Sequence, residues 1–137
     1  MRRKVMPRGE QQCLIYSLAM VLDIHPSYLL DQFPHYFEET IFGLRGIHFQ
    51  EMIDYLLSEG YSCTLIEKRA FEQDSLEVDL PPDRFQNHID ASVGVLVGFN
   101  ERNKCHATAN DHGRILDPVI KPSKMEYFQY WRVDCIL

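Results

Sequence analysis

One cysteine in this chain stands where a nucleophile could be made. Cys13 opens a strongly helical apolar run within residues 11–23, so it falls in the first turn of the expected helix. Free backbone N–H groups and the positive end of the helix dipole stabilise a thiolate at that position. Such a thiolate attacks carbonyl groups when a base, and a group that orients the base, lie within reach.

His106 and Asp117 could supply those two groups. We expect residues 104–109 and 114–116 to form neighbouring strands joined by a turn at 111–113. In such a hairpin residues 106 and 117 fall near the same level, where side chains on one face can touch. The pattern therefore predicts a carboxylate beside an imidazole. The alternative is that Asp117 is only a turn residue, because Asp-Pro commonly ends a strand.

The cysteine and the histidine also have ordinary structural interpretations. Cysteine is among the most buried residue types, and a single histidine on an apolar strand is usually a satisfied core residue. The order of Cys13, His106 and Asp117 on helix, strand and strand favours chemistry. Cys105 beside His106 suggests a metal pair, but successive strand residues point to opposite faces. We therefore predict no metal site, and we expect Cys63 and Cys135 to be core thiols.

The elements that must position these residues can be read in order. Apolar residues recur at helical spacing after Cys13 and again between Gly46 and Gly60, with a short helix expected at 26–32 between them. Residues 35–45 are expected to form an irregular loop, and residues 61–67 a strand. The later strands are expected at 92–99, 104–109, 114–116 and 130–137.

Helices come first and an antiparallel sheet second, so the predicted fold class is α+β. Residues 1–10 are expected to be a solvated basic tail, and residues 11–137 a single domain. That domain divides into a helical half, an acidic connection with a short helix of its own, and a β half. These parts span residues 11–67, 68–90 and 91–137.

Composition excludes several classes of protein. The formal net charge of -6 over 137 residues argues against a nucleic-acid binder. No apolar run approaches the roughly 20 residues that span a bilayer, and polar residues follow the basic start where a signal peptide would be apolar. The four cysteines are widely spaced, without a C-x-x-C pair. We therefore expect a cytoplasmic protein with four free thiols and no membrane partner.

Three separated motifs, in their order, resemble a known family. The motifs are Gln12-Cys13-x-x-x-Ser17-Leu18-Ala19-Met20-Val21-Leu22, then Gly46-Ile47 opening a helix that ends at Gly60-Tyr61, then Cys105-His106-Ala107 with Gly113-Arg114-Ile115-Leu116-Asp117-Pro118. Together they resemble the papain-like cysteine peptidases, in the C39-like branch related to bacteriocin-leader peptidases. The likeness covers about three-quarters of the chain.

The resemblance implies a papain-like fold and a role for each residue. Cys13 would be the nucleophile, His106 the general base and then acid, and Asp117 the group that orients the imidazole. In that family a glutamine about six residues before the cysteine shares the oxyanion hole with the backbone N–H of the cysteine. Here that position is Pro7, which leaves Gln11 and Gln12, at a different offset, as the possible donors.

Three hypotheses about function follow. The first is a hydrolase without a cofactor that cleaves a peptide or amide bond through a Cys-His-Asp triad and a thioester intermediate. Acyl transfer and deamidation share that chemistry, and the substrate would be a peptide or protein. The second is an inactive papain-like module that binds a peptide or partner protein. The third is a metal-binding regulator that uses Cys105 and His106. No pattern specifies the oligomeric state.

Overall fold

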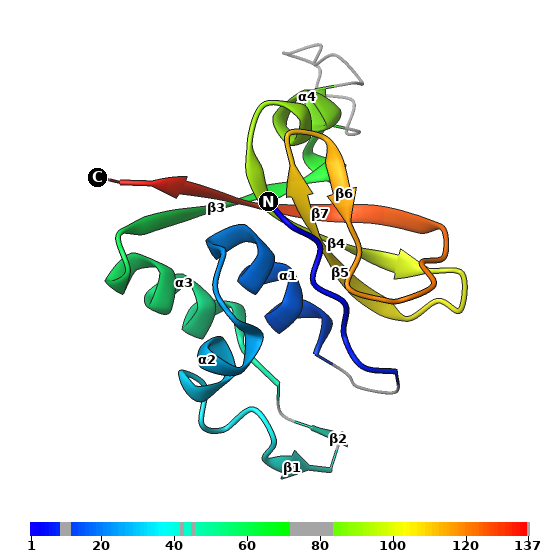
Figure 1. The fold of residues 1–137 in the computed structure, drawn as a ribbon. Coiled ribbons are helices and arrows are strands. Elements are labelled where there is room, and N and C mark those ends of the chain that lie inside the picture. The colour runs from blue at the N-terminus through cyan, green and yellow to red at the C-terminus, as the bar shows by residue number, and fades with distance from the viewer. Residues whose placement is uncertain (9–11, 42, 45, 72–83, 137) are drawn as a thin grey trace.

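The computed structural model describes residues 1–8, 12–41, 43–44, 46–71 and 84–136 (Figure 1). The fold is α+β, as predicted: N-terminal helices pack against a five-stranded antiparallel sheet. A separate two-stranded hairpin lies in the helical half. In the described part of the chain, no helix is long and apolar enough to cross a membrane.

Three helices precede the sheet. Helix α1 spans Cys13–Leu22 and ends at Asp23, which has a left-handed backbone with φ of 55°. Helix α2 spans Pro26–Asp31, with proline at its first position and a capping bond from the Ser27 N–H to the His25 ring. Helix α3 spans Phe49–Ser58. The predicted loop at 35–45 contains the hairpin of β1 (Glu39–Thr40) and β2 (Gly43–Leu44).

The large sheet has the strand order β3-β7-β4-β5-β6. The strands span Tyr61–Glu67 (β3), Val93–Asn100 (β4), Cys105–Asp111 (β5), Arg114–Leu116 (β6) and Met125–Cys135 (β7). Strand β7 therefore enters between β3 and β4, which joins the two halves of the chain. A 3₁₀ turn, η1 (Lys68–Phe71), and helix α4 (Arg84–Asp90) complete the described elements.

The two faces of the sheet bury different layers. Helices α1 and α3 cover one face, where Val95, Ala107 and Trp131 meet Leu18 and Leu56. Helix α4 covers part of the other face (Figure 1), where its apolar side chains pack on Leu96 and Tyr130. His106 lies opposite Gly98 and two residues from Thr108, the partner of Leu96, so its side chain leaves the sheet on the α4 face.

Most of the predicted elements are confirmed, and some bounds differ. Strands 61–67 and 114–116 have the predicted bounds. The last strand begins five residues earlier than predicted, at Met125, because it continues through a bulge against β4. Of the predicted connection at 68–90, residues 72–83 lie outside the described residues. Cys63 is half-buried and Cys135 is exposed at the end of β7, so the prediction of two core thiols is wrong for Cys135.

Residues 1–8 do not form the predicted solvated tail. Met6 is buried, and its backbone N–H donates to the carbonyl of Pro118 at 2.7 Å. The Lys4 N–H donates to Sδ of Met20 on α1. Met1 packs against the cluster of Met20, Ala109 and Leu116, and with Met6 it holds the segment along the body beside α1 (Figure 1).

Candidate active site

The first turn of α1 fixes the position of Cys13. The N–H of Tyr16 donates to the carbonyl of Gln12 at 3.0 Å, so Cys13 is the first residue inside the helix. One turn later the buried hydroxyl of Ser17 donates to the Cys13 carbonyl at 2.6 Å. The Cys13 side chain is half-buried, which leaves part of it open to a reagent.

Cys13 meets the sheet along one edge of β5. Strand β6 pairs with residues 109–111 only, so it does not reach the first residues of β5. There the side chain of His106 and the backbone N–H of Ala107 lie close enough to the Cys13 thiol to lower its pKa. Because β6 is short, the first residues of β5 keep backbone groups that a longer β6 would hydrogen-bond, and Cys13 lies beside them.

His106 also contacts Asp117, as predicted. Its Nε2 lies 2.8 Å from Oδ1 of Asp117, and the exposed fractions of the two side chains are 10% and 9%. The register pairs Ala109 with Leu116, so Asp117 continues to the level of Thr108 rather than of His106. The contact is therefore diagonal across one face, which a histidine ring can span. Because Nε2 faces Asp117, Nδ1 is the ring nitrogen left for Cys13.

The surroundings of Cys13 favour its charged form. Burial by itself would raise the pKa of the thiol. The hydrogen bond with His106, the N–H of Ala107, the positive charge of His106 and the N–H of Leu14 together outweigh burial, so the pKa of Cys13 is lowered. A lowered thiol pKa is the property that separates a nucleophilic cysteine from an inert one.

The pKa of His106 moves in the opposite direction. Burial opposes the charged imidazolium, but the hydrogen bonds to Asp117 and to Cys13, and then the charges of both partners, raise the pKa to about 9. A lowered thiol pKa beside a raised imidazole pKa favours transfer of the thiol proton to the imidazole, which gives a thiolate and an imidazolium. The arrangement can attack a carbonyl and hold a proton ready for the leaving group.

The N-terminal segment holds the loop that carries Asp117. Arg3 donates from Nε to the Asp117 carbonyl at 2.8 Å and from Nη2 to the Val119 carbonyl, and Met6 binds the Pro118 carbonyl between them. The Val119 N–H donates to Oδ1 of Asp117 at 2.8 Å. Three successive carbonyls are thus held by residues 3–6. Nothing in the sequence pairs residues more than a hundred positions apart, so sequence reasoning missed Arg3.

Of the two predicted oxyanion donors, Gln11 lies outside the described residues, and the Gln12 side chain is not among the groups that shift the pKa of Cys13. Gln12 is half-buried, donates its backbone N–H to Sδ of Met6 at 3.2 Å, and makes no capping bond with its side chain. Pro7 is exposed. The oxyanion role of Gln11 and Gln12 stays a prediction, whereas the N–H groups of Ala107 and Leu14 are contacts that sequence reasoning missed.

The neighbouring Cys105 and His106 point apart, as predicted. Cys105 is exposed and His106 is buried, so the two side chains do not converge on one ion. Among the described residues, no group of three or more His, Cys, Asp or Glu side chains could hold a metal ion.

A groove of about 390 Å³ borders the site on the Asp117 side. Tyr127, Met125 and Ile115 line its apolar part, and Arg3 and Asp117 its polar part. The hydroxyl of Tyr127 lies 3.5 Å from the hydroxyl of Thr108. A chain that approaches Asp117 from outside would therefore meet a mixed surface of aromatic and polar groups.

The fold and this site define a class: an α+β protein in which a cysteine at a helix N-terminus lies near a buried histidine that is hydrogen-bonded to an aspartate. Comparison of the chain with protein-family models, curated proteins and solved structures finds no match. Inference about its activity therefore depends on the geometry and electrostatics of the site.

Proposed function

We propose that the protein is a cysteine-dependent hydrolase with a papain-like fold, acting on a peptide or amide bond. The observation that supports the proposal is the buried His106–Asp117 pair near Cys13 at the start of α1, with the pKa of the thiol lowered and that of the imidazole raised. A purely structural cysteine would not need a buried imidazole–carboxylate pair beside it.

In the first half of the reaction the Cys13 thiolate attacks the carbonyl carbon of the substrate. The resulting oxyanion lies near the first turn of α1, where the backbone N–H of Cys13 is one of the groups without an intrahelical partner. His106 gives its proton to the leaving amine as the C–N bond breaks. The products of this half are a free amine and a thioester on Cys13.

In the second half a water molecule attacks the thioester carbon. Neutral His106 accepts the proton of that water, and the C–S bond breaks to release a carboxylic acid and restore the thiolate–imidazolium pair. Asp117 keeps the ring in place through its bond to Nε2, so that Nδ1 faces the reacting atoms in both halves. An amine in place of water would give acyl transfer, and a glutamine side chain as substrate would give deamidation.

An activated ester tests this chemistry without knowledge of the natural substrate. With p-nitrophenyl acetate we expect an acetyl group on Cys13, detected by peptide mass spectrometry, and repeated turnover that is absent in Cys13→Ala. Cys63→Ala is the matched control and should keep the wild-type rate. Equal hydrolysis by wild type and Cys13→Ala would contradict the proposal.

The second candidate is a papain-like module that binds a peptide without cleaving it. The specific observation in its favour is the exposed Pro7 at the position of the family's oxyanion glutamine. The same experiment separates the two candidates. A Cys13 that becomes acetylated and stays acetylated would favour the binding module, because attack would occur without deacylation.

A further inference from the structure

Charge is distributed unevenly along the chain. Residues 12–67, the helical half, contain eight acidic side chains and one basic one, Arg45. Residues 1–8 contain four basic side chains and no acidic one. Residues 100–125 contain five basic and three acidic side chains, and two of those acids are engaged: Asp117 by His106, and Asp111 by Arg114 and the N-terminus. The protein is acidic overall but has one basic side.

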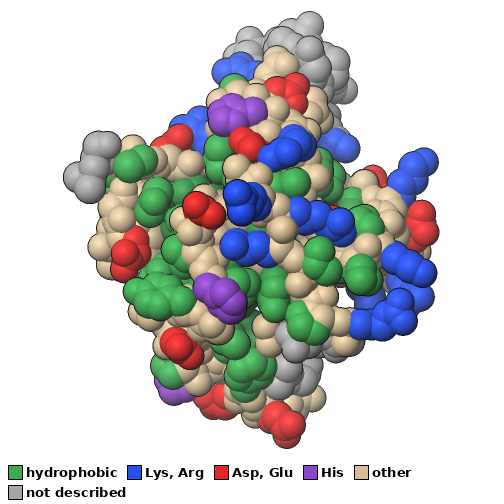
Figure 2. All heavy atoms as spheres, in the orientation of Figure 1, with side chains coloured by type: hydrophobic (Ala, Val, Ile, Leu, Met, Phe, Trp, Pro, Cys, Tyr) green, Lys and Arg blue, Asp and Glu red, His purple; other side chains and the backbone are tan. Residues whose placement is uncertain are grey.

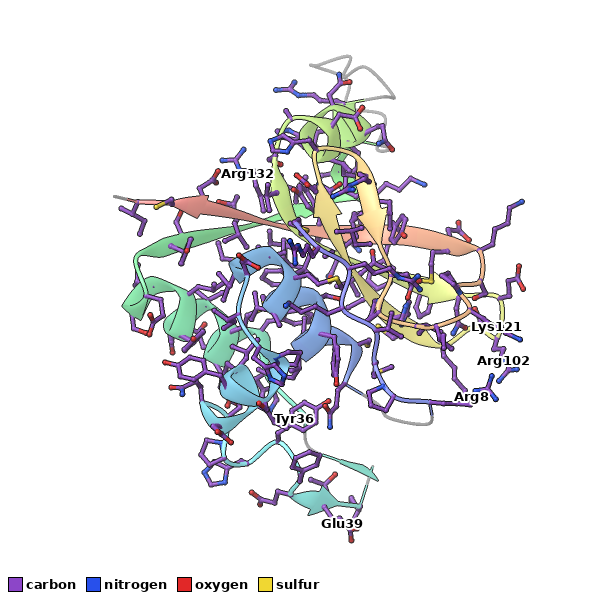
Figure 3. The ribbon with its side chains drawn as sticks, viewed as in Figure 1. Arg8, Tyr36, Glu39, Arg102, Lys121 and Arg132 are labelled. Carbon is purple, nitrogen blue, oxygen red and sulfur yellow. The ribbon has the colours of Figure 1, made fainter. Side chains whose placement is uncertain are left out.

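Three exposed cations form what we call the basic rim: Arg8, Arg102 and Lys121. They come from the N-terminal segment, the β4–β5 turn and the loop after β6, and Figure 3 shows them extending to the same side of the molecule. Figure 2 shows blue side chains gathered there, whereas red ones are scattered over the helical half. Glu101 in the same turn and Glu126, the register partner of Phe99, are exposed carboxylates. Lys104 and Lys124 are exposed as well, so five cations face two carboxylates in this region.

Each rim residue is tied by a short stretch of chain to one member of the site. Arg8 precedes Cys13 by five residues, Arg102 precedes His106 by four, and Lys121 follows Asp117 by four. A residue spans at most about 3.6 Å, so each cation begins within about 18 Å of its site residue. The turn that carries Arg102 is closed by Asn100, whose side chain accepts from the N–H groups of residues 102 and 104.

The groove beside Asp117 lies next to the basic rim in the chain. Pro122 and Ser123, which line it, follow Lys121 directly, and Arg3 lines it as well. Charges on a protein surface act over about 30 Å at low salt, which exceeds the bound of about 18 Å, so at low salt the rim acts on a chain entering this groove or the region of Cys13. A partner that enters from the rim side therefore meets positive charge before it meets the thiol.

We propose that the substrate of this site is an acidic segment of peptide, in which glutamate or aspartate side chains flank the bond to be cleaved and contact the basic rim. The inference rests on the proposed function, because it assigns a substrate class to that site. A nucleic acid would also be attracted by cations, but the acidic helical half would repel a polymer longer than the rim. A short acidic peptide fits the size of the patch.

Two thiol-reactive peptides test the inference. They are vinyl sulfones of equal length, one with two glutamates and the other with two glutamines in the same places. Labelling of Cys13 is followed by peptide mass spectrometry at low and high salt. We expect the acidic peptide to label Cys13 about tenfold faster at low salt, and the preference to vanish at high salt.

A matched pair of variants locates the effect. Combined Arg8→Gln, Arg102→Gln and Lys121→Gln should abolish the preference for the acidic peptide. Combined Arg69→Gln, Arg84→Gln and Arg132→Gln removes the same charge elsewhere, Arg132 lying on the opposite side in Figure 3, and should leave the preference intact. An equal loss in both variants would overturn the inference, because it would show an effect of net charge alone.

The outcome also distinguishes this inference from the proposed function. Neutral iodoacetamide reports the reactivity of Cys13 without regard to charge. Rapid labelling by iodoacetamide together with equal rates for the two peptides would overturn only the acidic substrate. Slow labelling of Cys13 by every reagent, no faster than labelling of Cys63, would overturn the proposed function as well.

Discussion

Cys13 and Cys63 are two half-buried thiols in one small protein, with opposite electrostatics. Burial alone would raise the pKa of both thiols. At Cys63 on β3 burial is the largest cause, the negative charge of Asp134 acts in the same direction, and the pKa rises to about 11. At Cys13 an imidazole and backbone N–H groups reverse the effect of burial. The hydrogen-bond donors around a thiol, rather than its depth, therefore decide whether it is a nucleophile.

The largest expected effect comes from removing the imidazole. His106→Ala leaves Cys13 as buried as before but without its strongest favourable partner, so its pKa should rise toward that of Cys63. The thiolate fraction at neutral pH falls as that pKa rises, and iodoacetamide labelling of Cys13 should slow by about tenfold or more. His112→Asn removes the imidazole of the more exposed Asp111–His112 pair and suits the positive φ of residue 112, so it is the matched control and should leave labelling of Cys13 unchanged. Unchanged labelling in His106→Ala would remove the distinction between the two thiols.

The next effect concerns the orienting carboxylate. Asp117 is the first favourable cause of the raised pKa of His106, so Asp117→Asn should lower that pKa from about 9 by roughly one unit. Hydrolysis needs the charged imidazolium, and its rate falls as pH rises through the His106 pKa. The alkaline fall should therefore begin at lower pH in Asp117→Asn. An NMR titration of the His106 ring measures the shift directly, with Asp111→Asn, in the more exposed Asp111–His112 pair, as the control.

A smaller effect is expected from the N-terminal segment. Arg3 acts on the site only through the loop of Asp117, as a positioning residue. Arg3→Gln should reduce esterase turnover by about threefold and move the alkaline fall toward lower pH, because Asp117 is held less firmly. Arg3→Lys should restore part of both. Arg2→Gln changes an exposed neighbour, and if it gave the same shift, the effect of Arg3 would be one of charge rather than of position.

The smallest effect is expected at Cys63. Asp134→Asn removes the second cause of its raised pKa but leaves burial, the first, in place. We expect labelling of Cys63 to rise less than about threefold, and only in alkaline solution. A gain as large as the loss in His106→Ala would show that nearby charge, and not hydrogen bonding, dominates both sites.

The sequence predicted those parts of the fold and site that depend on local patterns. Helical spacing after Cys13 placed the thiol in a first turn. The turn residues at 111–113 predicted the bounds of β6, and with them the position of Asp117 near His106. In the structure His112 and Gly113 of this turn have positive φ. Two other features depend on contacts between distant parts of the chain. One is the order of strands, with β7 between β3 and β4, and the other is the hydrogen bonding of Arg3 to the loop at 117–119. Hydrophobic spacing carries no information on such pairings.

The same limit applies within the site. The N–H of Ala107 reaches Cys13 because β6 ends short of it, a matter of strand length and register that residue types do not express. The prediction that Cys135 is a core thiol was wrong for a related reason. Cys135 is the last residue of β7, and the end of that strand is exposed. The chemistry-bearing residues could be named from sequence, but the backbone groups that assist them could not.

The pH dependence of labelling at Cys13 and Cys63 in a single sample tests the central claim most directly. Iodoacetamide is applied over a pH series, and the modified fraction of each cysteine is read by peptide mass spectrometry. The account predicts that Cys13 keeps its reactivity well below the ordinary thiol pKa of about 8.5, whereas Cys63 becomes reactive only as the pH approaches 11. Coincident profiles, or a Cys13 that becomes reactive only above its ordinary pKa, would contradict an activated nucleophile.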